Sequence, residues 1–162
     1  MTEAALPEHQ IFISLGSNIR PEKHLPRALE LLRWAVQVER VSCAWQTPSV
    51  GTSGPDFINV VVQVKSSLQA EGLKKRLLRP IESRLGRVRT VDKFAARTID
   101  LDILTIDNVV MDSDIWTQAH LAVPLAELIP GYAHPMSGET LAQIAARLAQ
   151  STRMIPRCDL FN

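Results

Sequence analysis

The chain has 162 residues, 46% of them hydrophobic, which favours a single globular domain over residues 1–162 with its own core. Its formal net charge of +1 argues against a general binder of polyanions such as nucleic acid. No stretch of the sequence reaches the roughly 18 apolar residues of a membrane-spanning helix.

Apolar periodicity and turn-forming residues predict four strands and four helices in chain order. The expected strands are Ile11–Leu15, Val38–Trp45, Phe57–Val64 and Ile99–Ile106. The expected helices are Pro21–Val36, Leu73–Leu85, Val123–Ile129 and Thr140–Gln150. Pro80 lies inside the second helix, where its ring should clash with the carbonyl of Arg76, so we expect a kink there and a C-terminal cap at Gly86.

The order strand, helix, strand, strand, helix, strand is the split βαβ pattern and predicts a ferredoxin-like α+β fold. In this fold an antiparallel sheet carries both helices on one face and leaves the other face free. We expect Asp100, Asp102, Phe57 and Asn59 to meet on the free face. RNA-recognition modules share this topology, but they need exposed aromatic side chains on the central strands, and here carboxylates take those positions.

Two carboxylates stand two residues apart in the last predicted strand. Side chains alternate along a strand, so Asp100 and Asp102 share one face and lie roughly 7 Å apart. Two anions this close repel each other unless a cation lies between them. With Arg87, Arg89 and Arg97 nearby, the pattern favours Mg²⁺-nucleotide chemistry. The alternative is a solvated polar strand face whose carboxylates form salt bridges with those arginines.

Positive charge is concentrated between Lys74 and Arg97, where nine basic side chains stand against Glu82 and Asp92. A local positive field of this kind suits a small polyphosphate ligand. The first half of the segment, Lys74–Arg84, equally suits the solvated face of a helix.

The remaining features predict an ordinary cytoplasmic protein that acts as a monomer. Cys43 and Cys158 lack metal-ligand spacing, and a disulfide scaffold is not expected at this chain length. The four histidines form no cluster in the sequence. Residues 1–10 contain no apolar run, so we expect a disordered terminus and no secretory signal.

Several short motifs occur together at a characteristic spacing. They are Leu15-Gly-Ser-Asn18, Thr47-Pro48, Pro55-Asp-Phe-Ile-Asn59, Gly86-Arg-Val-Arg89, Arg97-Thr-Ile-Asp-Leu-Asp102 and Pro124-Leu-Ala-Glu-Leu-Ile-Pro130. Over roughly residues 11–148 the chain thereby resembles the 6-hydroxymethyl-7,8-dihydropterin pyrophosphokinases of folate biosynthesis. The resemblance implies transfer of pyrophosphate from ATP to the hydroxymethyl group of a reduced pterin, with release of AMP.

The resemblance also implies a role for individual residues. Asp100 and Asp102 would hold two Mg²⁺ ions, and with Arg87 and Arg97 they would form the catalytic group. ATP would be bound by Glu82, Arg87, Arg89, Arg97, Ile103 and His120. The pterin would be bound by Thr47, Pro48, Val50, Phe57, Asn59 and Phe94. Without the resemblance, Phe57 would be interpreted as a core aromatic and Asn59 as a solvated amide.

One segment departs from the family pattern. Between His120 and Pro124 the chain is several residues shorter, and the arginine and the second aromatic that the family carries there are missing. We therefore expect weaker pterin binding, unless Phe94, Trp116 or His120 takes over the role. The alternative functions are action on a different hydroxymethyl-pterin and nucleotide binding without turnover.

Overall fold

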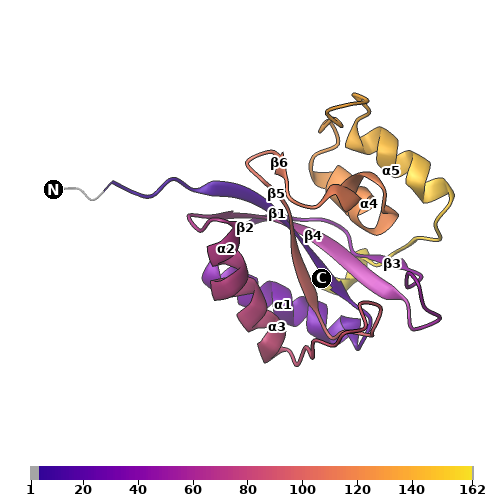
Figure 1. Ribbon diagram of the computed structural model, residues 1–162, viewed down its shortest axis with the longest axis horizontal. Coiled ribbons are helices and arrows are strands. Elements are labelled where there is room, and N and C mark those ends of the chain that lie inside the picture. Colours follow the sequence, from indigo (N-terminus) through magenta and orange to yellow (C-terminus); the bar gives the residue numbers. More distant parts are fainter. Residues whose placement is uncertain (1–3, 162) are drawn as a thin grey trace.

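The computed structural model describes residues 4–161, which form an antiparallel sheet with helices on both faces (Figure 1). The hydrogen-bonded strand order is β6-β5-β1-β4-β3-β7, and β2 also pairs with β4. The strands are β1 (His9–Ser17), β2 (Gln37–Val41), β3 (Trp45–Thr47), β4 (Phe57–Ser66), β5 (Asp100–Ile106), β6 (Val109–Val110) and β7 (Ile155–Pro156).

The single strand predicted over Val38–Trp45 is two strands, β2 and β3, which pair with different parts of β4. The break falls at Ser42–Ala44, and its cause is visible in the hydrogen bonds. The backbone N–H of Cys43 donates to the Glu127 carboxylate at 2.8 Å, so it does not join the sheet. A side chain from a distant helix therefore interrupts a strand that its own sequence predicts to be continuous.

One face of the sheet carries α1 (Pro21–Ala35) and the pair α2 (Ala70–Leu73) and α3 (Arg79–Arg84) (Figure 1). Their apolar sides cover Ile13 of β1, Val62 of β4 and Ile103 of β5 in one buried cluster. Together with the strand order, this arrangement confirms the ferredoxin-like α+β fold.

The helix predicted over Leu73–Leu85 is irregular just before Pro80, where a kink or break was expected. Residues Lys74–Leu78 form a π-helical turn between α2 and α3, and the N–H of Arg79 bonds to the carbonyl of Lys74. The wider turn accommodates the proline ring and its missing N–H. The helix then ends at Gly86, whose φ of 82° allows the N–H of Arg87 to reach the Glu82 carbonyl at 3.0 Å. This C-terminal cap was predicted, and it determines where Arg87 begins its loop.

The opposite face of the sheet is only partly free. Helices α4 (Ala119–Leu128) and α5 (Leu141–Gln150) lie on that side in Figure 1. They bury a second apolar cluster built on Phe12, Val61 and Leu104 of the sheet. The expectation of a wholly free face was therefore wrong, because these inward-facing apolar residues need cover. Helix α4 also begins four residues before the predicted Val123, which places His120 in its first turn.

Cys43 and Cys158 form a disulfide, although no disulfide scaffold was expected at this chain length. The two residues are 115 positions apart in sequence, and only the return of the chain to β3 brings their Cα atoms to 4.6 Å. The bond therefore joins the segment before β3 to the C-terminal part of the described chain.

The N-terminal prediction is wrong for its last two residues and lies partly outside the described residues. His9 and Gln10, expected in a disordered terminus, pair with Ser66 and Lys65 of β4. The predicted disorder of residues 1–3 concerns positions outside the described range. Within residues 4–161, no helix combines the length and apolar character needed to cross a membrane.

We predict that Cys43→Ser lowers the free energy of unfolding by about 2–4 kcal/mol, because the bond restricts a long loop of the unfolded chain. Urea denaturation followed by circular dichroism measures the change. Wild-type protein in dithiothreitol serves as the control and should lose a similar amount. Equal stability of variant and oxidised wild type would contradict the prediction.

Candidate active site

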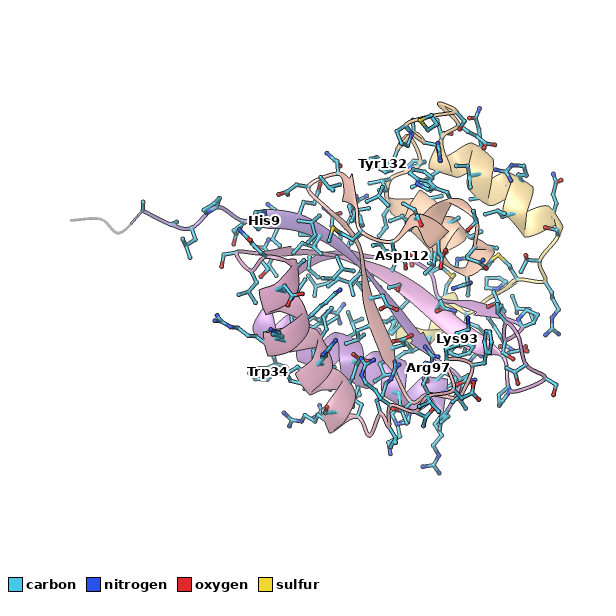
Figure 2. The ribbon with its side chains drawn as sticks, in the orientation of Figure 1. His9, Trp34, Lys93, Arg97, Asp112 and Tyr132 are labelled. Carbon is cyan, nitrogen blue, oxygen red and sulfur yellow. A yellow bond between two sulfur atoms is a disulfide. The ribbon has the colours of Figure 1, made fainter. Side chains whose placement is uncertain are left out.

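A pocket of about 220 Å³ opens on the part of the sheet that α4 leaves uncovered. In Figure 2, Asp112 lies on the α4 side of this region, and Lys93 and Arg97 lie on the side of the loop that precedes β5. The lining residues are Ser14, Gly16, Thr47, Pro48, Val50, Phe57, Asn59, Lys93, Phe94, Arg97, Asp100, Asp102, Asp112, Asp114, His120 and Leu121. Ten of the predicted site residues are among them.

Strand β5 divides its residues between core and pocket. Ile99, Leu101 and Ile103 are at most 5% exposed and pack under the sheet, so Asp100 and Asp102 project from the other face. This alternation confirms the predicted orientation of the two carboxylates. It also corrects one assignment: the Ile103 side chain lies in the core and lines neither this pocket nor its neighbour, although it was predicted to bind ATP.

A glycine on β1 makes room for the Asn59 amide. Gly16 pairs with Asn59 on one side and with Asp100 on the other. A Cβ atom at Gly16 would stand 2.5 Å from Oδ1 of Asn59, closer than real Cβ contacts come. The glycine therefore permits the close approach that leaves Asn59 beside Asp100 in the pocket floor.

Asp100 is neutralised by two arginines of the preceding loop. Arg97 donates to its Oδ2 at 2.6 Å, and Arg87 forms a short contact with Oδ1. Arg87 also donates to the carbonyl of Ile99, and its Nε is buried without a hydrogen-bond partner among residues 4–161. The salt-bridged interpretation of this strand face is thus correct for Asp100. The unused Nε remains a buried donor for a bound group.

Asp102 has a different environment, because no ion pair is formed to it within the described part of the chain. Burial in the pocket raises its pKa to about 6, and the nearby charges of Asp100 and Asp112 act in the same direction. A carboxylate surrounded by other carboxylates is a favourable place for a cation. The pocket therefore provides a locally negative floor beneath a positive rim.

Asp112 and Asp114 belong to the pocket and were missed in the sequence. They follow β6, and Asp112 caps the short helical turn Ser113–Trp116 by accepting from the N–H of Asp114 at 3.0 Å. Because their spacing in the sequence is as typical of a helix cap as of a binding site, it did not identify Asp112 and Asp114 as pocket residues. No three His, Cys, Asp or Glu side chains within residues 4–161 are arranged to hold a metal by themselves.

Oxygen ligands from two carboxylates still fit Mg²⁺, which usually keeps several waters and takes further oxygens from substrate phosphates. Asp100 and Asp102 satisfy this requirement, since both project into the same pocket.

Glu82 forms ion pairs with Arg87 and Arg89 and does not line the pocket. Its side chain is 4% exposed and lies 3.0 Å from Arg87 and 3.1 Å from Arg89. Burial raises the pKa of Glu82, while the two guanidinium groups act against the rise. The predicted role at the nucleotide therefore becomes an indirect one, because the carboxylate faces the arginines that would meet phosphate.

A second pocket of about 250 Å³ adjoins the first and is formed by the loop between α3 and β5. It is lined by Arg87, Arg89, Lys93 and Arg97, and the last two of these line both pockets. The three predicted arginines thus converge on one hollow. Four cationic side chains around a hollow suit phosphate oxygens.

Two phenylalanines face the first pocket from different elements. Phe57 comes from β4, and the Arg97 guanidinium lies 6.0 Å from its ring centroid. Phe94 comes from the loop before β5 and packs closely on Gly51, whose φ is 73°. Trp116 instead stacks on Tyr132 with centroids 5.6 Å apart and is not a lining residue. Phe94 and Trp116 were both suggested as replacements for the family aromatic that is missing between His120 and Pro124. Phe94 lines the pocket, and Trp116 does not.

His120 lines the first pocket from the first turn of α4. Burial lowers its pKa, although Asp114 and Asp112 favour the protonated form. At neutral pH the ring is therefore uncharged, and it offers a hydrogen-bonding nitrogen to a ligand in the pocket.

Comparison with known proteins gives consistent relatives. The family model described as 7,8-dihydro-6-hydroxymethylpterin-pyrophosphokinase (HPPK) matches residues 12–130. The 2-amino-4-hydroxy-6-hydroxymethyldihydropteridine pyrophosphokinase of Synechocystis is 33% identical over 147 residues, covering 84% of this chain and 74% of that protein.

Longer relatives contain a similar region. The folic acid synthesis protein fol1 of Schizosaccharomyces pombe is 29% identical over 91% of this chain, but the match covers only 22% of that protein. The HPPK-DHPS protein of Plasmodium falciparum has a similar fold, with a TM-score of 0.72 and 11% identity over 91% of this chain and 47% of its own. These relatives therefore carry a further part that this chain does not span.

The family match covers more than half of the chain, and the Synechocystis relative is similar along most of its length. The matched range, residues 12–130, includes every residue that lines the two pockets. The chain belongs to the 7,8-dihydro-6-hydroxymethylpterin-pyrophosphokinase family.

Proposed function

We propose that this protein transfers pyrophosphate from ATP to the hydroxymethyl group of 6-hydroxymethyl-7,8-dihydropterin, as a monomeric domain of residues 1–162 in the cytoplasm. The observation that carries the proposal is the meeting of two carboxylates, four cationic side chains and two phenylalanines in adjoining pockets. The pyrophosphokinase relatives support the same reaction.

In this reaction the hydroxymethyl oxygen attacks the β-phosphorus of ATP. The bond from that phosphorus to the oxygen bridging it to the α-phosphorus breaks, AMP leaves, and the hydroxyl proton passes to solvent. Such a transfer requires the protein mainly to position the reactants and to neutralise charge. Arg87, Arg89 and Arg97 are placed to contact phosphate oxygens through paired hydrogen bonds.

Asp100 and Asp102 are the residues that would hold Mg²⁺, with two ions proposed. When bound, the metal neutralises phosphate charge and polarises the phosphoryl oxygens. Asp102 projects into the pocket without a guanidinium partner among residues 4–161, whereas Asp100 also restrains Arg87 and Arg97. The two carboxylates therefore contribute differently: Asp102 as a ligand, and Asp100 as both a ligand and a support for the arginines.

For the pterin, the pocket offers an aromatic surface and an amide. Phe57 and Phe94 provide apolar rings for a flat heterocycle, and Asn59 provides both a donor and an acceptor for its polar edge. Phe94 is placed to supply the second aromatic surface that the short connection between His120 and Pro124 does not provide. This supports a pterin substrate despite the shorter chain at that point.

The direct test is the formation of AMP from ATP and Mg²⁺ in the presence of 6-hydroxymethyl-7,8-dihydropterin, with related hydroxymethyl-pterins assayed in parallel. Pterin-dependent AMP formation supports the proposal. A preference for another hydroxymethyl-pterin would change the substrate. Nucleotide binding without AMP formation with any of them would overturn the enzymatic role.

We predict that Asp102→Asn lowers turnover on the order of 10³-fold or more, because one anionic metal ligand is removed. The same change should stabilise the free protein well above pH 6, because the ionised carboxylate is unfavourable there. Since the pKa in the folded state, about 6, exceeds the ordinary value of 3.8, the gain should shrink as the pH falls between these values.

Thermal melting across this pH range measures the stability of the Asp102→Asn variant, and AMP release measures its turnover. Asp100→Asn is the matched comparison. It should also lose activity, but it breaks ion pairs to Arg87 and Arg97 and should not gain stability. Full activity of the Asp102→Asn variant would contradict the metal-binding role and would leave Asp100 and Asp102 as a polar strand face.

We predict that Arg97→Lys lowers kcat by about 10- to 100-fold, equivalent to ~1.5–3 kcal/mol for a charge-assisted hydrogen bond. The charge remains, but the planar group that contacts Asp100 and lines both pockets is removed. Lys74→Ala, on the exposed side of the π-helical turn, is the control and should leave steady-state kinetics unchanged. Equal losses in both variants would refute the special role of Arg97.

We predict that Phe94→Ala weakens pterin binding by about 2- to 10-fold, since an aromatic contact contributes roughly 0.5–1.5 kcal/mol beyond its buried area. Calorimetry with the reduced pterin measures the affinity. Trp34→Ala is the control, because Trp34 is 83% exposed on α1 and lines neither pocket. Unchanged affinity in Phe94→Ala would show that Phe94 does not replace the missing aromatic.

A further inference from the structure

The end of the chain returns to the sheet beside the pterin side of the pocket. After α5, residues 153–161, here called the C-terminal strap, run along β3 (Figure 1). Within the strap, β7 pairs with β3 through Ile155 opposite Gln46 and Pro156 opposite Trp45. The N–H of Arg157 also donates to the carbonyl of Ala44 at 2.7 Å. The strap is therefore an added strand next to the one that ends at Thr47.

Polar side chains of the strap meet those of the sheet at Asp56. Its Oδ2 atom accepts from Nε2 of Gln46 at 3.0 Å and from a guanidinium nitrogen of Arg153 at 2.8 Å. Oε1 of Gln46 in turn accepts from Arg157 at 3.3 Å. One carboxylate thus joins the two strands and the strap.

The position of Asp56 matters because of its neighbours. Gln46 precedes Thr47, and Asp56 precedes Phe57, while Thr47 and Phe57 form the last residue pair of the β3–β4 ladder. Both of these residues line the pocket. Beyond this pair the chain enters the exposed loop of residues 48–55, which contributes Pro48 and Val50 to the same pocket.

We infer that Asp56 and Arg153 are positioning residues that fix the base of the 48–55 loop and thereby set the width of the pterin side of the pocket. The inference rests on the proposed pterin substrate. Neither residue lines a pocket, so each acts through Thr47, Phe57 and the loop between them.

The strap is anchored beyond this contact, so it can resist movement of the loop. Arg157 lies 3.4 Å from Glu22 on α1, and Cys158 is bonded to Cys43, two residues before β3. On the loop side, Asn18, the residue after β1, donates a longer hydrogen bond of 3.4 Å to the carbonyl of Pro55. Without Arg153 or Asp56, the loop keeps its internal bonds and the Asn18 contact, but the ion pair that joins its base to the anchored strap is lost.

The expected effect is modest, because the side chains of Arg153 and Asp56 are 60% and 27% exposed. Exposed pairs of this kind change an equilibrium by about three- to fivefold, equivalent to ~0.7–1 kcal/mol. We expect the KM for the pterin to rise by this factor in Arg153→Gln and Asp56→Ala, with kcat and the KM for ATP unchanged. A purely structural role would not affect one substrate alone.

The experiment compares these two variants, their double variant and the control Arg147→Gln in the full chain. Arg147 forms an ion pair of similar exposure with Glu139, 2.9 Å away, and both residues lie outside the two pockets. Hydrogen–deuterium exchange of the 48–55 amides without ligand is measured beside the steady-state constants. The exchange measurement does not depend on turnover, so it tests the positioning role even if the proposed substrate is wrong.

Faster exchange of the 48–55 amides in both single variants, with no further change in the double variant, supports the inference. In an active enzyme the KM for the pterin should follow the same pattern. The inference would be overturned if Arg153→Gln and Asp56→Ala had the same amide exchange and the same KM for the pterin as Arg147→Gln. A loss confined to kcat in these variants would also overturn it. If wild type shows no pterin-dependent AMP formation, the proposed function fails, while the exchange data still decide whether the strap restrains the loop.

Discussion

The ion pairs of Asp100 with Arg87 and Arg97 are the interaction on which the site depends. They connect the loop between α3 and β5 to the floor of the sheet, and this loop forms the second pocket and contributes Lys93, Phe94 and Arg97 to the first. Glu82 extends the network beneath the loop through Arg87 and Arg89. Since Arg87, Arg97 and Asp100 are at most 22% exposed, their pairings contribute more to the loop's position than an exposed pair would, whereas Arg89 is 59% exposed.

The same network compensates the charge of one of the two pocket carboxylates and leaves that of the other uncompensated. Asp100 is compensated in the free protein, whereas Asp102 is surrounded by Asp100 and Asp112 and keeps a raised pKa. Helix α4 borders this environment, because it covers the apolar half of the sheet face and leaves the polar half as an open pocket.

The shorter connection into α4 has a structural explanation. The helix begins directly at Ala119, so His120 reaches the pocket from its first turn without a longer intervening segment. Phe94 reaches the pocket from the loop between α3 and β5. It packs closely on Gly51 of the 48–55 loop, which has no side chain to prevent the contact. The pocket thereby has two aromatic side chains: Phe57 comes from the family motif, and Phe94 comes from an element other than the one that carries the second aromatic in the family pattern.

Local pattern in the sequence was enough for the fold class, the orientation of Asp100 and Asp102, the helix irregularity before Pro80 and the cap at Gly86, because each depends on neighbouring residues. The motifs likewise identified most of the pocket lining. Contacts between distant segments required the tertiary structure: the Cys43–Cys158 bond, the interruption of β2 and β3 by Glu127, the burial of Ile103 and the arrival of Asp112. Strand and helix periods specify which way a side chain points, but only the packed chain decides which remote group stands opposite it.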